Sequence, residues 1–282
     1  MNPICLLFML FLRSRYILVS FGLLLFSCKS SVDTVVLQSQ VLETDTVFKA
    51  QKNEKSELRV FNIPNADASA GENTGPQVFK LNLGDQPLAI QPDAKNPEKL
   101  ITEFAFASFI NSQHTAALVQ LQDNSGLVAP FYIISLDGEK AKAYSLYRGS
   151  EGPQDSRFTK GQSEIGRSGY LINNDFFVTR VDGRVYKLAR QEPGQRIQGL
   201  HFMNSADRQT LVFLVNSALY QVHYPSGKTY TQPLPASAPK KPSGLFAWIQ
   251  QNLVWERDKD QILWLKSSAA DNRVRNLNEF KK

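Results

Sequence analysis

The sequence is poor in the residues that build metal sites and disulfide frameworks. It has 282 residues and two cysteines, Cys5 and Cys28, and its three histidines are His114, His201 and His223. The histidines form neither an HExxH nor an HxH pattern, and the chain contains no Gly-x-Ser-x-Gly elbow. We therefore predict no catalytic residue, no metal and no cofactor. A Ser-His-Asp site assembled from scattered positions would leave no short motif and stays open.

The chain also lacks a strong excess of either charge. Lys and Arg total 32 against 26 Asp and Glu, which gives a formal net charge of +6. Nucleic-acid-binding proteins usually carry a denser basic stripe, so we expect no nucleic-acid partner. The composition is 42% hydrophobic and 11% aromatic, which is enough apolar surface for a folded core and is not typical of a disordered chain.

Long apolar runs are scarce, with one exception near the start of the chain. Residues 16–26 are apolar and follow Arg13 and Arg15. A membrane-spanning helix needs roughly 18 or more apolar residues, and this run does not reach that length. A short apolar run behind a basic segment is typical of a signal peptide, which we assign to residues 1–27.

The end of this segment contains the most specific motif in the sequence. The tetrad Leu25-Phe26-Ser27-Cys28 resembles the bacterial lipobox, in which a branched apolar residue stands three positions before a cysteine and a small residue stands directly before it. The resemblance implies cleavage between Ser27 and Cys28, a diacylglyceryl group on the Cys28 sulfur and an acyl chain such as palmitate on the new amino terminus. Phe26 is more similar to spirochaete lipoboxes than to enterobacterial ones. The alternative is an ordinary thiol after a cleaved secretory peptide.

The lipobox resemblance also implies a location. Lys29 follows the cysteine, where enterobacterial lipoproteins retained in the inner membrane carry Asp. We therefore expect a lipoprotein of the bacterial outer membrane, on its periplasmic face or at the cell surface, held to the membrane through the lipid on Cys28. Cys5 would leave with the signal peptide, so the mature chain would contain no free thiol.

Composition divides the mature chain into two segments. Residues 28–57 are rich in Ser, Thr, Gln, Lys and Glu, which predicts a flexible tether. The alternative is a first strand around Val32 to Leu42. From residue 58 to 282, apolar residues occur in short β-branched or aromatic runs separated by Pro and Gly, which predicts one all-β domain. Examples of these runs are residues 131–136, 176–181 and 211–215.

Hairpin signals recur along this domain. The pairs Asp137-Gly138, Asp182-Gly183 and Ser226-Gly227 each place a small polar residue before a glycine, which favours a tight turn with positive φ. We expect Gly183 to need that conformation. The three glycines are spaced about 45 residues apart, a period typical of propeller blades.

The segment Gly199–Leu234 carries the hairpin pattern most completely. It resembles the TolB-like, WD40-like β-propeller repeat, in which an apolar strand precedes a Ser-Pro-Asp-Gly turn and three further strands. Ser205 and Asp207 match the Ser and Asp of that turn, whereas Ala206 replaces its Pro. The segment Phe104–Leu146 has the same order, and weaker units lie around residues 78–90, 168–191 and 245–277. The resemblance implies a propeller-like domain of about five blades, each a four-stranded antiparallel sheet. The alternative is a β-sandwich.

These features favour a non-catalytic protein-binding or scaffold module whose partner is another envelope protein or a host protein. The alternatives are an envelope hydrolase or carbohydrate-processing enzyme and a host-facing adhesin. We also expect His223, which alternates with Gln221 along a strand, to face solvent.

Overall fold

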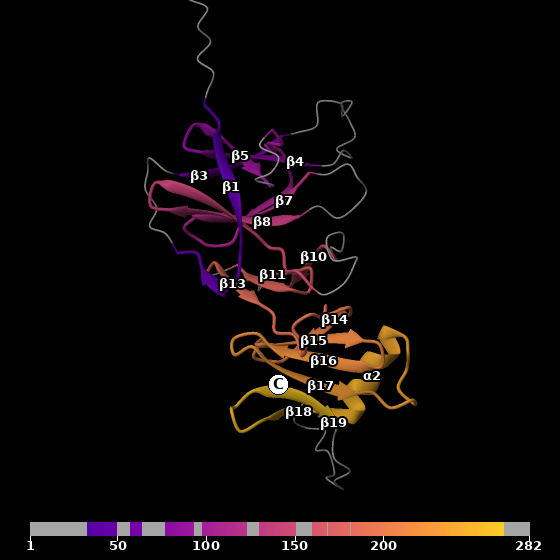
Figure 1. Ribbon diagram of the computed structural model, residues 1–282. Helices are drawn as coiled ribbons and strands as arrows, with labels where there is room; N and C mark the ends of the chain where they lie inside the picture. The colour runs from indigo at the N-terminus through magenta and orange to yellow at the C-terminus, as the bar shows by residue number, and fades with distance from the viewer. Residues whose placement is uncertain are drawn as a thin grey trace, which may run out of the picture. The chain divides into compact units, whose positions relative to one another are not determined.

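A computed structural model describes residues 33–49, 57–63, 77–92, 98–122, 130–150 and 160–267, except residues 168 and 181. The chain divides into two compact units, residues 1–34 and 35–282. The described residues of the larger unit form β-strands and one helix, α2 (Pro242–Asn252) (Figure 1).

The structure describes the following strands in chain order. They are β1 (Val35–Val41), β2 (Thr46–Val47), β3 (Leu58–Ile63), β4 (Val78–Leu83), β5 (Gln86–Gln91), β6 (Phe104–Phe109), β7 (Ala116–Leu121), β8 (Phe131–Asp137), β9 (Lys140–Ser145), β10 (Gln162–Ile165), β11 (Gly169–Ile172), β12 (Phe176–Thr179), β13 (Arg184–Lys187), β14 (Leu200–Asn204), β15 (Thr210–Val215), β16 (Ala218–His223), β17 (Lys228–Pro233), β18 (Leu253–Arg257) and β19 (Leu263–Ser267).

Eight of the first nine strands form one sheet, and most of this sheet closes into a barrel. Seven of them are hydrogen-bonded in the order β4-β5-β1-β9-β8-β7-β6, and a pairing between β4 and β6 closes the ring, while β3 extends outward from β4. Strand β1 runs parallel to both of its neighbours, β5 and β9, whereas the other neighbouring strands of the barrel are antiparallel. The barrel is therefore mixed, and its amino-terminal strand completes it.

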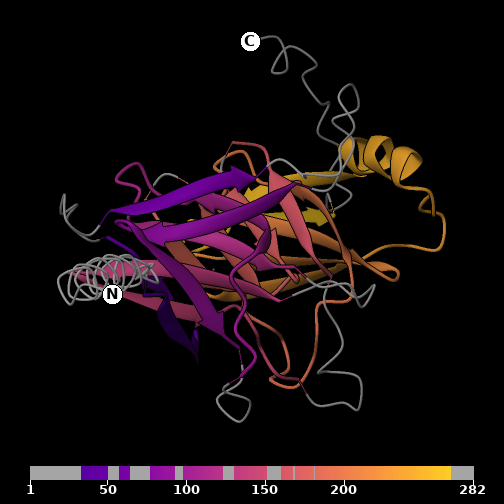
Figure 2. The ribbon, with the colours of Figure 1, turned by 90° about the horizontal axis from the view of Figure 1, so that it is seen from above.

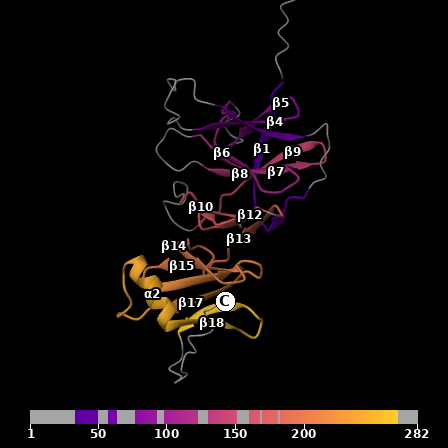
Figure 3. The ribbon, with the colours of Figure 1, turned by 180° about the vertical axis from the view of Figure 1, so that it is seen from behind.

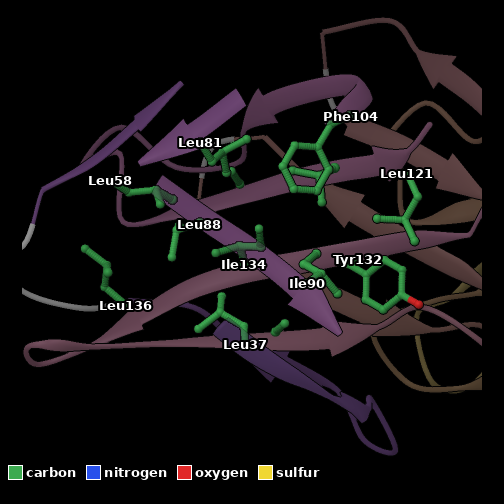
Figure 4. Packing of buried hydrophobic residues seen from close by; sticks show 13 residues of the cluster. Leu37, Leu58, Leu81, Leu88, Ile90, Phe104, Leu121, Tyr132, Ile134 and Leu136 are labelled. Atoms are coloured by element: carbon green, nitrogen blue, oxygen red, sulfur yellow. The ribbon is translucent and has the colours of Figure 1, made fainter. Parts of the chain in front are cut away.

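The barrel interior is filled by apolar side chains. Because successive residues of a strand point to opposite faces, every second residue of β7 and β8 points inward. Ala117, Val119 and Leu121 of β7 lie in this core, which Figure 4 shows from close by. The labelled core residues are Leu37, Leu58, Leu81, Leu88, Ile90, Phe104, Leu121, Tyr132, Ile134 and Leu136.

A second sheet packs on the outside of the barrel. Its order is β10-β11-β12-β13-β2. The outward residues of β7 and β8, such as Leu118 and Ile133, share one apolar cluster with Tyr170, Phe176 and Val178 of this sheet. The barrel wall and the second sheet therefore bury apolar side chains against each other.

The opposite face of the second sheet packs against a third sheet, β14-β15-β16-β17. Phe177 and Tyr186 of the second sheet share a cluster with Phe213 and Val222 of the third. Strands β12 and β15 are thus buried on both faces. Double-sided burial explains why their sequences are continuous hydrophobic runs instead of alternating patterns.

Helix α2 and the ribbon β18-β19 cover the remaining face of the third sheet. Leu245 and Ile249, one helical turn apart, point into a cluster with Val212 and Leu219. Figures 2 and 3 show the helix alongside the orange strands of the third sheet. Pro242 stands in the first turn of the helix, where its missing N–H costs no hydrogen bond.

The predicted all-β class is confirmed, but the described strands do not form a propeller. The segment Gly199–Leu234 is the expected four-stranded antiparallel sheet, and Phe104–Leu146 contributes four consecutive antiparallel strands. The propeller prediction is wrong because β1 enters between β5 and β9 and joins the first strands into one barrel. The β-sandwich alternative does not describe this barrel either. Residues 245–277 were expected to form a weak blade, but this segment begins within helix α2.

The amino-terminal part of the domain also differs from expectation. Residues 35–47, placed in the tether by composition, form β1 and β2. Leu37 is buried in the barrel, and Leu42 and Phe48 are buried between the barrel and the second sheet. The alternative of a first strand near Val32 to Leu42 matches the structure, in which β1 begins with the β-branched and apolar run Val35-Val36-Leu37.

Candidate functional site

The predicted lipid attachment site lies outside the described residues. This applies to both Ser27 and Cys28, so cleavage and lipidation remain predictions. Within the part of the chain that the structure describes, no helix is both long and apolar enough to cross a membrane. Nor do the described residues contain a group of three or more His, Cys, Asp or Glu side chains placed to hold a metal ion.

Two of the three histidines occupy local structural positions. His114 adopts a φ of 57° in the β6–β7 turn and stacks on Phe109 with ring centroids 4.3 Å apart. The Nε2 atom of His201 lies 2.8 Å from Oδ1 of Asn204, and burial lowers the pKa of His201. Stacking on Phe109 holds the His114 ring in place, and the contact with Asn204 holds the His201 ring in place.

The expectation that Gln221 and His223 face solvent is wrong. Gln221 is fully buried and His223 is 8% exposed, because the ribbon β18-β19 covers this face of β16. The Gln221 amide donates to the Leu265 carbonyl at 2.6 Å and accepts from the Leu265 N–H at 2.8 Å. One side chain thus replaces a strand neighbour and joins the ribbon to the third sheet.

The most strongly charged buried site is a cluster of Asp175, Arg148, Arg190 and Arg196, which we call the arginine cluster. Asp175 follows Asn173 and Asn174, both at φ 54°, in the β11–β12 turn. Arg190 Nη2 donates to one carboxylate oxygen at 2.5 Å, and Arg196 Nη1 lies 3.4 Å from the other. The Asp175 and Arg190 side chains are 3% and 1% exposed.

The cluster joins three parts of the domain through backbone carbonyls. Arg148, just after β9, donates to the carbonyl of Leu188, and Arg190 donates to that of Gly149 at 3.2 Å. The Tyr220 hydroxyl, from the third sheet, donates to the Ala189 carbonyl at 3.0 Å. Barrel, second sheet and third sheet therefore meet at the segment that follows β13.

Electrostatics show what the arginine cluster can and cannot do. Burial raises the pKa of Asp175, and the hydrogen bond and positive charge of Arg190 oppose this rise. Burial and the nearby Arg190 lower the pKa of Arg148. Arginine does not exchange protons near neutral pH, and the carboxylate is occupied on both oxygens. The cluster is suited to fixing the three sheets in place and not to acid–base catalysis.

The main exposed apolar site lies on β14, an edge strand of the third sheet. Leu200 is 65% exposed and Phe246 of α2 is 45% exposed. Phe202 lies between them in sequence and packs against Phe246 with ring centroids 6.2 Å apart. Leu200 pairs with Leu214, which packs toward the helix, so Leu200 stands on the same face. We call Leu200, Phe202 and Phe246 the β14 surface.

Neither of these sites is marked by a motif in the sequence. The members of the arginine cluster are scattered between residues 148 and 196 and follow no spacing rule. The β14 surface unites a strand with a helix that lies some 40 residues further along the chain, beyond a proline-rich segment. Only the packing of the sheets brings these residues together.

Comparison with known proteins provides no relative from which to transfer a role. No protein-family model, no curated protein and no solved structure matches the chain.

Proposed function

We propose that this chain is a lipid-anchored protein of the bacterial outer membrane that acts as a non-catalytic protein-binding or scaffold module. The lipid on Cys28 would hold it to the membrane, on the periplasmic face or at the cell surface. The partner would be another envelope protein or a host protein.

The observation that carries the binding role is the β14 surface. An edge strand has backbone groups that a further strand can pair with, and natural proteins usually protect such edges with charge. Strand β14 has no charged residue, and it places Leu200 in solvent and Phe202 against the partly exposed Phe246. An extended segment of a partner could add to this edge by main-chain hydrogen bonds and cover the apolar side chains.

A photo-crosslinking residue at position 246 tests this role in intact cells. We expect one defined crosslinked protein, and we expect Leu200→Asp in the same chain to remove it, because a buried charge opposes docking. A crosslinker at Asp85, whose side chain is 99% exposed in a turn of the barrel, is the matched control. Equal crosslinking at both positions, or crosslinking that survives Leu200→Asp, would contradict the proposed surface.

The anchor is tested separately by incorporation of labelled palmitate and by detergent phase partitioning. Wild-type protein should take the label and enter the detergent phase, since two or more acyl chains are enough for stable attachment. Cys28→Ser should take no label. An unlabelled wild-type protein in the aqueous phase would remove the membrane from this proposal.

A second candidate function is an envelope hydrolase or carbohydrate-processing enzyme. Such an enzyme commonly uses a pair of carboxyl groups in one site. Asp175 is the only acidic side chain that is buried among the described residues, and arginines occupy both of its oxygens. Turnover of a glycoside, ester or peptide by the purified protein would favour the enzyme over the binding module.

A further inference from the structure

We propose that one end of the barrel, made by the start of β1, the β4–β5 turn and the β8–β9 turn, faces the membrane at short range. This inference rests on the proposed lipid attachment at Cys28. It goes further by naming the surface of the domain that meets the lipid headgroups.

The strand directions define this end of the barrel. Because β1 is parallel to β5 and β9, all three strands start at the same end. Val35 pairs with Leu88 near the start of β5, and Ser39 pairs with Ala143 of β9. The turns that lead into β5 and β9 contain Asp85 and Gly138, and both turns therefore lie at the end where β1 begins.

The short connection between lipid and barrel sets the distance. Val35 starts β1 and Leu37 is buried in the barrel core, so the chain is fixed from this point onward. A chain extends at most about 3.3–3.6 Å per residue, so the stretch from Cys28 to Val35 spans at most about 25 Å. A free tether up to residue 57 would instead reach roughly 100 Å. The pairing of β1 therefore removes most of the reach that composition suggests.

The other end of β1 leads away from the lipid. The chain continues into Leu42 and Phe48, which pack between the barrel and the second sheet, and the Phe48 N–H donates to the Gly183 carbonyl at 2.9 Å. The third sheet, with Leu200, packs on the far face of the second sheet. The β14 surface is thus separated from the lipid-proximal end by the second sheet.

The chemistry of the lipid-proximal end fits passive contact with a bilayer. Its exposed charges are of both signs: Arg59 lies 3.3 Å from Asp85, Lys142 contacts Asp137, and Glu139 and Lys140 also lie at the β8–β9 turn. Attraction to anionic headgroups requires a cluster of unpaired basic residues. Acyl chains would therefore supply the attachment, and the distance between barrel and membrane should depend little on salt.

Single-cysteine labelling tests this orientation on the full lipidated chain, because Cys28 would be occupied by lipid. Asp85→Cys places a donor fluorophore at the lipid-proximal end, and Asp260→Cys places it in the β18–β19 turn. The two positions are matched, since each aspartate lies in a hairpin turn and in an exposed ion pair, with Arg59 and Lys228 respectively. Removing such a pair costs little stability. The acceptor is a headgroup-labelled lipid in vesicles of phosphatidylethanolamine and phosphatidylglycerol.

We expect energy transfer from position 85 to exceed that from position 260 by about twofold or more, at both low and high salt. A long Gly/Ser linker inserted between residues 34 and 35 should lower the transfer from position 85 toward the value for position 260. If the protein floats with the vesicles but transfer is equal at both positions, or the linker has no effect, the orientation is refuted. If the protein does not float with the vesicles, the lipid anchor itself is refuted.

Discussion

Gly183 offers the sharpest test of the packing between barrel and second sheet. Its φ is +64°, the same as that of Gly138, so alanine suffers the same backbone strain at either position. The surroundings differ. A Cβ atom at Gly138 would meet nothing within 4 Å, whereas one at Gly183 would lie 3.0 Å from the Phe48 carbonyl oxygen and 3.2 Å from Cβ of Asn111.

Asn111 makes the contact at Gly183 costly because it is itself fixed by buried hydrogen bonds. Its amide nitrogen donates to the Phe48 carbonyl at 2.8 Å and to the Thr115 hydroxyl at 2.9 Å, and its oxygen accepts from the Thr115 N–H at 3.0 Å. The left-handed conformation costs a non-glycine residue about 1–2 kcal/mol. Disturbing a buried hydrogen bond adds about 1–3 kcal/mol.

We therefore expect Gly138→Ala to lower the free energy of unfolding by about 1–2 kcal/mol, and Gly183→Ala to lower it by about 2–5 kcal/mol. Urea denaturation followed by tryptophan fluorescence measures both values, and Gly183→Val should be worse than Gly183→Ala because a β-branched side chain is larger and stiffer. If the two alanine variants are equally stable, the close approach of Phe48 and Asn111 to Gly183 is not present in solution, and the reasoning fails.

Three further predictions concern buried polar groups. Asp175→Asn should destabilise the domain by about 3–5 kcal/mol, because two buried arginines lose their counter-charge. The control Asp85→Asn changes a side chain that is 99% exposed and should stay within about 0.5 kcal/mol of wild type. A thermal melt in which both variants match wild type would contradict the pairing at Asp175. Gln221→Leu should leave the Leu265 N–H and carbonyl unpaired and cost about 1–3 kcal/mol. Amide hydrogen exchange in this variant should become faster in the ribbon β18-β19 than in the third sheet, and a uniform change in exchange would argue against the amide bridge. Burial lowers the pKa of His201 and of His223, so the unfolded chain takes up protons first as the pH falls through about 6.5. The free energy of unfolding should therefore decline from pH 7 to pH 5. The double variant His201→Gln, His223→Gln should weaken this pH dependence, and an unchanged pH dependence would assign it to other groups.

The sequence predicts the local structure of this domain well. Gly138, Gly183 and Gly227 all have positive φ, as the hairpin signals require. Two turns also share a local hydrogen-bond pattern: Asn111 and Asp258 each accept, through a side-chain oxygen, the N–H four residues later, and the residue three positions on has positive φ in both turns. These features depend on neighbours in the chain, and short-range patterns determine them.

Long-range features were not predictable from the same patterns. Strand β1 lies in a segment of largely polar composition, and its place in the barrel depends on strands β5 and β9 that lie far along the chain. Gln221 and His223 look like the solvent face of a strand until the ribbon covers them. The arginine cluster likewise exists only because three sheets meet. A local pattern specifies which residues alternate on a strand, but it cannot specify what will cover each face.

The parallel strand β1 has a consequence for the order of folding. Val41 of β1 pairs with Ser145, and Thr46 of β2 pairs with Val185, so these two contacts each span roughly a hundred residues or more, a separation that slows folding. Strand β1 is synthesised before both of its partners, and its pairing with β9 must wait for residues near 145. Until β9 is available, β1 has an open edge on the side where β9 pairs with it, and open edges are aggregation-prone. A chain held in the unfolded state until export ends would avoid this intermediate, because all three strands would then be present when folding starts.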